Sequence, residues 1–143
     1  EQHDIQFVLP LHPRTAKLLE TNTIGDLYKR VKEESRLKII EPVSFLDMIA
    51  LEKNAKIIVT DSGGVQKEAF FFQKPCVILR PETEWVELVA CGAAKIVGWN
   101  RSDIVNAFNH YINNNEVSFP ELFGNGTSGK FMCEQMLASF KMQ

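Results

Sequence analysis

The sequence predicts an α/β fold with a parallel sheet of about five strands and helices on both faces. Five short apolar runs rich in β-branched residues recur along the chain, near residues 5–9, 37–40, 57–60, 76–79 and 94–97. Segments with helical patterns separate these runs from one another. Such an alternation is typical of a parallel sheet covered on both faces. Because there are no internal repeats, low-complexity tracts or evident linkers, residues 1–143 are expected to form a single domain.

The length and composition are ordinary for one globular domain. Of 143 residues, 45% are apolar and 24% charged, which is enough for a real core. The formal net charge of −2 provides no basic field and argues against general nucleic-acid binding. No apolar run approaches the roughly 20 residues that a membrane-spanning helix needs, and no signal-peptide pattern is present, so the cytoplasm is expected. The three cysteines lack CxxC spacing and indicate neither a disulfide framework nor a zinc site.

The first predicted strand, residues 5–9, ends at Pro10 and leads through a short loop into a helix from about Ala16. Pro13 is tolerated near a helix start because the amide that proline lacks would have no partner there. His12 thus lies at the end of a strand. By itself, a histidine there is better explained as a surface or capping residue than as a ligand group.

A second helix is predicted over residues 23–35, because apolar side chains recur there at helical spacing. The strand at 37–40 is followed by a third helix over about 44–53. Ser44 is the expected N-cap of that helix, and Asp47 stands at its third position.

The central stretch, residues 56–87, reads as strand, glycine turn, helix and strand, which is a β-α-β unit. Ser62, Gly63 and Gly64 form the turn before a helix over about 65–72. Two glycines let the backbone approach a ligand with no Cβ in the way, and a helix start offers unpaired N–H groups and the positive end of its dipole. This turn is therefore a candidate phosphate site.

Glu68 lies one helical turn beyond Gly64. A carboxylate beside a diphosphate would be repelled unless it faced a neutral hydrogen-bond donor such as a ribose diol, so the pair points to a nucleotide. The alternative has about equal weight: Ser62 caps the helix, the glycines make a tight turn and Glu68 is a solvated helix residue. Short glycine motifs often occur by chance, so the spacing alone does not decide between the nucleotide site and the purely structural turn.

The strand at 76–79 ends at Arg80, which leaves the sheet at the same edge as the glycine turn. The next helix is expected over 83–91, with Thr83 as its cap. Arg80 and Glu84 either face the ligand edge or form a surface ion pair worth about 0–1 kcal/mol.

The last part of the chain contains two further predicted helices. Ser102 is the expected cap of a helix over 103–113, and a final helix is expected over about 127–140. The apolar face of that final helix consists of Phe131, Met132, Met136, Leu137 and Phe140.

The stretch TDSGGVQKEA, followed by KPCVILRPETEWVE and then AAKIVG, resembles the C-terminal domain of the non-hydrolysing UDP-N-acetylglucosamine 2-epimerases. That family carries TDSGG-x-Q-x-E-A, then K-P, then R-x-x-T-E-R-P-E or R-x-x-T-E-W-x-E, and this order and spacing are met over about thirty residues. The weaker similarities of PLHPRT, IIEPVSFLDMIAL and FGNGTSGKFMCEQML extend the resemblance to nearly the whole chain. Many members have Arg-Pro where this chain has Trp85-Val86, which leaves the exact UDP-sugar and the role of Trp85 open.

The resemblance implies a Rossmann-like domain that binds UDP or a UDP-N-acetylhexosamine, with neither a cofactor nor a metal. In this family the loop before the third helix holds the uracil, and the histidine after the first strand lies at the cleft between two domains. The substrate-binding residues implied here are Ser62, Gly63, Gly64, Glu68, Arg80, Glu84, His12, Val43 and Phe45.

By the same resemblance, the parent enzyme is an isomerase that inverts C2 of UDP-GlcNAc or a related UDP-2-acetamido sugar by eliminating and re-adding UDP, in cell-surface polysaccharide precursor synthesis. The family's catalytic carboxylates lie on an N-terminal domain that these residues lack. No catalytic residue is therefore expected here, the chain alone is expected to be inactive, and the parent is expected to be a homodimer. Two alternatives stay open: the nucleotide-sugar domain of a glycosyltransferase, and a non-enzymatic UDP-sugar sensor.

Overall fold

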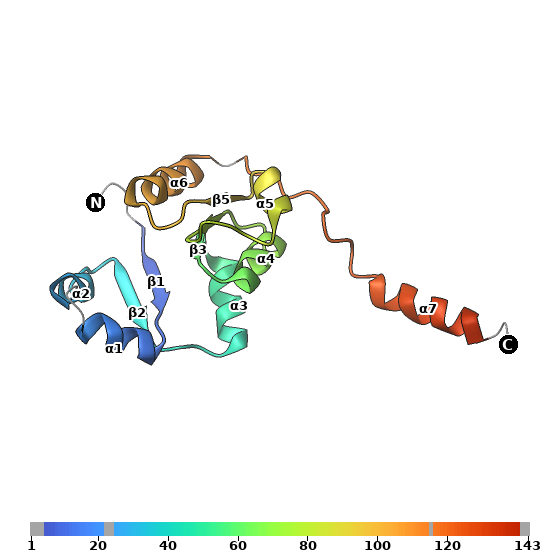
Figure 1. Cartoon of the computed structure of the whole chain (residues 1–143), viewed down its shortest axis with the longest axis horizontal. Helices are drawn as coiled ribbons and strands as arrows, with labels where there is room; N and C mark the ends of the chain where they lie inside the picture. The colour runs from blue at the N-terminus through green and yellow to red at the C-terminus, as the bar shows by residue number, and fades with distance from the viewer. Residues whose placement is uncertain (1–4, 22–24, 115, 141–143) are drawn as a thin grey trace. The chain divides into compact units, whose positions relative to one another are not determined.

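The computed structural model describes residues 5–21, 25–114 and 116–140, and shows strands and helices in alternation (Figure 1). Within these residues there are five strands and seven helices. Every strand pair is parallel, so the predicted α/β class is confirmed. The chain divides into two compact units, residues 1–51 and 52–143, and each is described by itself.

The first unit contains a two-stranded parallel sheet. Strand β1 (Phe7–Pro10) pairs with β2 (Leu37–Ile40) along its whole length. Helices α1 (Pro13–Thr21) and α2 (Gly25–Lys32) connect the two strands, and Tyr28 of α2 is buried. Because α1 begins at a proline, its first position loses no hydrogen bond.

Helix α2 ends at Lys32, before the end expected from the sequence, while its predicted start at residues 23 and 24 lies outside the described residues. A local side-chain contact explains the early end. Glu34 Oε1 accepts a hydrogen bond from the Arg36 amide at 3.2 Å and one from Arg36 Nε at 3.1 Å. Such bonds between a side chain and the nearby backbone compete with helical pairing.

Helix α3 (Phe45–Asn54) begins as predicted. The Ser44 hydroxyl accepts a hydrogen bond from the Asp47 amide at 3.3 Å and donates one to Asp47 Oδ2 at 2.6 Å. Ser44 is therefore the N-cap, and its reciprocal contact with the acidic residue at the third position fixes where the helix starts.

The second unit contains a three-stranded parallel sheet in the order β3-β4-β5, joined by helices. Its elements are β3 (Ile58–Thr60), α4 (Gly63–Phe71), β4 (Cys76–Ile78), α5 (Val86–Ala90), β5 (Ala94–Ile96), α6 (Arg101–Asn113) and α7 (Ser128–Phe140). All five expected strands are thus present, but they pair as a sheet of two and a sheet of three and not as the single sheet that the sequence predicted.

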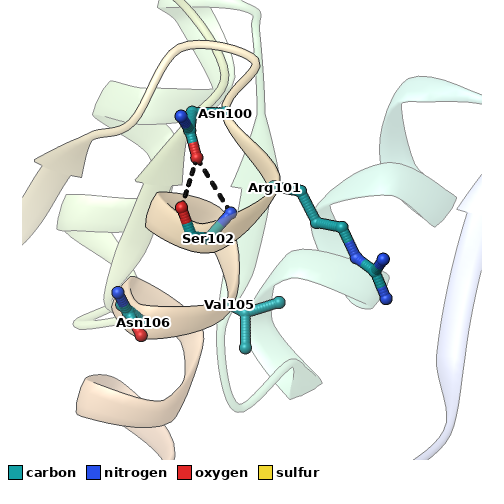
Figure 2. A pocket seen from close by; sticks show the side chains of 5 residues that line it. All are labelled: Asn100, Arg101, Ser102, Val105 and Asn106. Carbon is teal, nitrogen blue, oxygen red and sulfur yellow. Dashed lines mark hydrogen bonds between the residues drawn. The ribbon is translucent and has the colours of Figure 1, made fainter.

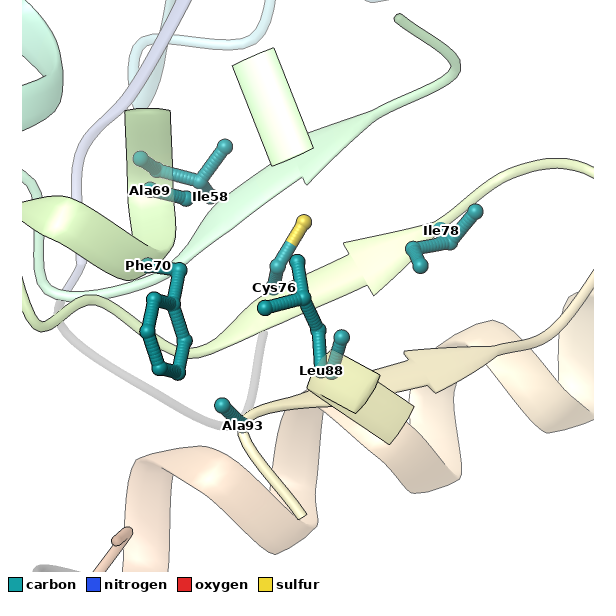
Figure 3. Packing of buried hydrophobic residues seen from close by; sticks show 8 residues of the cluster. Ile58, Ala69, Phe70, Cys76, Ile78, Leu88 and Ala93 are labelled. Atoms are coloured by element: carbon teal, nitrogen blue, oxygen red, sulfur yellow. The ribbon is translucent and has the colours of Figure 1, made fainter. Parts of the chain in front are cut away.

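Different helices cover the two faces of the three-stranded sheet, as predicted. Successive residues of a strand point to opposite faces. Cys76 of the central strand packs with Phe70 of α4 and Leu88 of α5 in one apolar cluster (Figure 3). Val77 packs on the opposite face with Tyr111 of α6. The central strand is therefore completely buried, which holds its C-terminal end in a fixed position at the sheet edge.

Two predicted helix caps are wrong: a different residue caps α6, and Trp85, which stands at the cap position of α5, makes no capping hydrogen bond with its side chain. Asn100, rather than Ser102, caps α6: its Oδ1 accepts hydrogen bonds from the amides of Ser102 at 2.9 Å and Asp103 at 3.3 Å. Thr83 does not cap α5, since its hydroxyl accepts a bond from the Trp85 amide at 3.1 Å, ahead of the helix. Asn, Ser and Thr are all good caps, so residue type alone does not decide between neighbours.

Helix α7 starts within one residue of the expected position. Its apolar side chains are exposed in this structure, namely Phe131, Met132, Met136, Leu137 and Phe140. None of the helices in the described part of the chain combines the length and apolar character that crossing a membrane requires.

Candidate functional site

The glycine turn lies where β3 ends and α4 begins. Ser62 has extended backbone angles, and its Oγ accepts a hydrogen bond from the Val65 amide at 3.5 Å, so Ser62 is the predicted cap of α4. The Ser62 amide donates in turn to Thr60 Oγ1 at 3.1 Å, which joins the turn to the strand. The first amides of a helix have no acceptor within the helix, so this end of α4 presents N–H groups and a positive dipole end.

The two glycines have different surroundings. A Cβ on Gly63 would overlap Glu84 Oε1 and stand 3.0 Å from Glu84 Cδ. A Cβ on Gly64 would meet nothing nearer than Ser62 Oγ at 3.9 Å, and Gly64 is exposed. Gly63 therefore makes room for a neighbouring loop, whereas Gly64 leaves the outer side of the turn open to a ligand.

The neighbouring loop, between β4 and α5, brings a charged pair to the turn. Arg80 Nη1 donates to Glu84 Oε2 at 3.0 Å, and both side chains are partly exposed. Because the Glu84 carboxylate also lies against Gly63, this ion pair is held beside the start of α4. The structure thus brings together five predicted site residues: Ser62, Gly63, Gly64, Arg80 and Glu84.

Two hydrogen bonds fasten this loop to α4, and a third holds the loop itself in shape. The Trp85 indole Nε1 donates to the Gly63 carbonyl at 2.8 Å. The Thr83 hydroxyl donates to Gln66 Oε1 at 2.5 Å and accepts from the Trp85 amide at 3.1 Å. Gln66 is fully buried, so its side-chain oxygen obtains here the partner that burial requires. Sequence reasoning missed these positioning contacts, although Gln66, Thr83 and Trp85 all stand in the quoted motifs.

Trp85 also takes part in an aromatic cluster beneath the loop. Its ring lies 5.8 Å from the ring of Phe123, edge to face. The ammonium group of Lys67 on α4 lies 4.2 Å from the centre of the Trp85 ring and 4.5 Å from that of Phe123. A cation over two aromatic rings is attracted by both, which adds a further link between α4 and the loop.

Glu68 is half-buried on α4, one turn beyond the glycine turn, and a second carboxyl group lies next to it. Glu52, in the last turn of α3, is buried, and burial together with the negative charge of Glu68 raises the pKa of Glu52 to about 7. Two acidic side chains in contact cannot both ionise without cost. Nothing in the sequence pattern pointed to Glu52.

The remaining predicted site residues belong to residues 1–51. His12 Nδ1 accepts a hydrogen bond from the Arg14 amide at 3.2 Å, so His12 caps α1, as the simpler interpretation held. Val43 is half-buried after β2, and Phe45, the first residue of α3, is 68% exposed. These three residues belong to a different compact unit from the glycine turn, and their role in binding stays a prediction.

A hollow of about 620 Å³ lies at the start of α6 (Figure 2). Its lining consists of Asn100, Arg101, Ser102, Val105 and Asn106. None of these is a predicted site residue, and Figure 2 shows the Asn100 side chain bonded to Ser102 as the helix cap. Among the described residues, no three His, Cys, Asp or Glu side chains are grouped so that they could hold a metal ion.

These features define a class of protein. An open glycine turn at the start of a helix, at the carboxyl edge of a parallel sheet, is the arrangement with which α/β proteins bind phosphate-containing ligands. The sequence model of the family described as UDP-N-acetylglucosamine 2-epimerase matches residues 1–137. The chain belongs to this family.

Individual relatives agree with this assignment. A UDP-N-acetylglucosamine 2-epimerase homolog from Methanococcus maripaludis is 46% identical over 129 residues, which are 90% of this chain and 35% of the relative. The UDP-2,3-diacetamido-2,3-dideoxy-D-glucuronate 2-epimerase of Pseudomonas aeruginosa is 42% identical over 90% of this chain and 34% of its own length. The chain spans about a third of the length of the curated relatives that it matches.

The solved structures place the same fold in two enzymes. The UDP-GlcNAc 2-epimerase of Methanocaldococcus jannaschii superimposes with a TM-score of 0.84 at 38% identity, covering 95% of this chain and 37% of that one. A second structure of that enzyme, in complex with UDP-GlcNAc and UDP, gives a TM-score of 0.78 at 38% identity, with 93% and 36% covered. The Neisseria meningitidis enzyme bound to UDP-GlcNAc gives 0.74 at 33% identity, with 93% and 36% covered.

Proposed function

We propose that residues 1–143 form the UDP-binding domain of a UDP-GlcNAc 2-epimerase, and that a further domain of the same polypeptide supplies the catalytic carboxylates. The observation that carries the proposal is the open side of Gly64 at the start of α4, with the Arg80–Glu84 pair held beside it. Family membership and the share of the relatives' length that this chain covers support it.

The reaction assigns a defined task to this site. The C2 proton leaves the sugar, the C1–oxygen bond breaks with its electron pair going to UDP, and a C1–C2 double bond forms; re-addition of UDP with protonation from the opposite side gives the C2 epimer. Negative charge grows on the departing diphosphate, and the α4 amides and the Arg80 guanidinium stabilise such charge where it develops. The Glu68 carboxylate accepts hydrogen bonds from the ribose hydroxyls. None of the residues in this site has to move a proton, and no metal or cofactor is required.

The substrate is UDP-GlcNAc or a related UDP-2-acetamido sugar. The name of the Pseudomonas aeruginosa relative supports the second possibility, because that enzyme acts on a diacetamido glucuronate derivative. His12, Val43 and Phe45 serve the sugar and the uracil in this proposal. The complete enzyme is a cytoplasmic homodimer that supplies precursors for cell-surface polysaccharides.

The test compares this chain with the complete polypeptide that carries it. Both are incubated with UDP-GlcNAc, and UDP-ManNAc formation is followed by proton NMR. The complete polypeptide should turn over and the isolated chain should not, because proton transfer at C2 needs an acid or base that this site lacks. Turnover by the isolated chain near the rate of the complete polypeptide would overturn the division of tasks. Binding without turnover by either would favour a UDP-sugar sensor, and transfer of the sugar to an acceptor would favour a glycosyltransferase.

A further inference from the structure

Glu52 is a buried acidic residue that the proposed reaction does not use. It lies in the last turn of α3 and is 3% exposed. Within the described residues, neither of its carboxylate oxygens has a hydrogen-bond partner. Burial removes this carboxyl group from bulk solvent, and no donor among the described residues replaces the lost hydration, so the ionised form is disfavoured.

The titratable groups that face Glu52 are Glu68 on α4 and Cys76 on β4. Neither provides a positive charge: burial raises the pKa of the Cys76 thiol to about 12, so this thiol stays neutral. Two ionised carboxylates only accept hydrogen bonds, so the contact between Glu52 and Glu68 becomes a bond only when one of them carries a proton. The buried member, Glu52, is the one whose ionisation costs more.

We propose that Glu52 is a positioning residue for nucleotide binding: its protonated carboxyl group donates a hydrogen bond to Glu68 and holds that side chain oriented toward the ribose. The inference rests on the proposed function, in which Glu68 accepts hydrogen bonds from the ribose hydroxyls. Glu52 itself does not touch the ligand.

Ligand binding then favours protonation of Glu52, and protonation of Glu52 favours ligand binding. A bound UDP-sugar carries two negative charges and displaces water from Glu68, and both effects make ionisation of the neighbouring Glu52 less favourable. The protein with protonated Glu52 therefore binds more tightly. Since burial and Glu68 raise the pKa of Glu52 to about 7, affinity should fall as the pH rises through neutrality.

The experiment measures the dissociation constant of UDP-GlcNAc by calorimetry on the complete polypeptide, between about pH 6 and about pH 8.5. Both phosphates of this ligand are esterified and keep one charge each over that range, so the ligand itself contributes no titration. In the wild type the dissociation constant should rise about threefold to tenfold. Glu52→Gln keeps a donor toward Glu68 but cannot ionise, and should abolish the pH dependence. The exposed Glu121→Gln variant is the control and should show the wild-type profile.

The Glu52→Leu variant distinguishes a role of Glu52 in positioning Glu68 from a role in stabilising the fold. Leucine fills the buried space without a polar group, so unfolding in urea at about pH 6 should show a variant at least as stable as the wild type. Its dissociation constant at that pH should nevertheless be about fivefold or more above that of Glu52→Gln, because Glu68 has lost its donor.

The possible outcomes distinguish the role of Glu52 from the proposed function. A flat wild-type profile, an unchanged slope in Glu52→Gln, or tight binding by Glu52→Leu would overturn the role of Glu52 while leaving the proposed function intact. No binding by the wild type at about pH 6 would overturn the proposed function itself, and this inference with it.

Discussion

At the scale of single residues, the two adjacent glycines differ in their surroundings, and so do two glutamates near them. Gly63 is needed because the Glu84 carboxylate occupies the position of its missing Cβ, whereas Gly64 has open space on that side. Glu68 is half-buried and Glu52 is buried. The sequence shows two glycines and many glutamates, and only the structure distinguishes which of them pack and which face outward.

Replacing Gly64 by alanine should separate stability from binding. The new methyl group meets only Ser62 Oγ at 3.9 Å, so α4 should gain about 0.5–1 kcal/mol from the better helix former. The same methyl group occupies the side from which a phosphate approaches, so UDP should bind at least about tenfold more weakly, a loss of about 1.4 kcal/mol. Urea unfolding and calorimetry measure the two effects. Wild-type affinity in Gly64→Ala would show that the diphosphate does not approach the turn there.

At the scale of elements, the site depends on how the loop between β4 and α5 is fastened to α4. The glycine turn, the cap at Ser62 and the following helix were predictable, because each depends on residues close in sequence. The bonds from Thr83 to Gln66 and from Trp85 to Gly63 were not, since they join positions 17 and 22 residues apart. The same limit explains why the predicted cap Thr83 is used elsewhere: a distant acceptor determines where its hydroxyl points.

Trp85→Phe should loosen this loop without emptying the aromatic cluster. Phenylalanine keeps a ring against Phe123 and Lys67 but loses the indole donor to the Gly63 carbonyl. The expected cost is about 1 kcal/mol of unfolding free energy, with faster hydrogen exchange at the amides of the glycine turn.

Trp99→Phe is the matched control. Trp99 is 83% exposed, so the same change there should leave unfolding and exchange at the turn as in the wild type. Equal effects of the two variants would mean that the indole bond of Trp85 does not stabilise the turn.

At the scale of the whole molecule, the alternation of strands and helices predicts the parallel sheets, and the structure confirms both the class and the five strands. The pairing into sheets of two and three strands was not predictable, because pairing depends on contacts between segments far apart in sequence. The apolar face of α7 is predictable from the periodic pattern of the sequence, whereas its exposure in the structure is not. The chain's share of about a third of its relatives leaves the chemical step outside these residues in the proposed function.

In the complete polypeptide, substitutions at two site residues should therefore affect the kinetic constants in two different ways. In the proposed function Glu68 contacts the ribose, and such contacts are the same in the ground state and the transition state. Glu68→Ala should therefore raise KM about tenfold with kcat little changed. In the same proposal Arg80 faces the departing diphosphate as it gains negative charge, so Arg80→Ala should lower kcat by about tenfold to a hundredfold. Steady-state conversion of UDP-GlcNAc measures both, with Glu121→Gln as the control. If Glu68→Ala lowered kcat as strongly as Arg80→Ala, Glu68 would have to act in the chemical step, and this domain would supply more than binding of UDP.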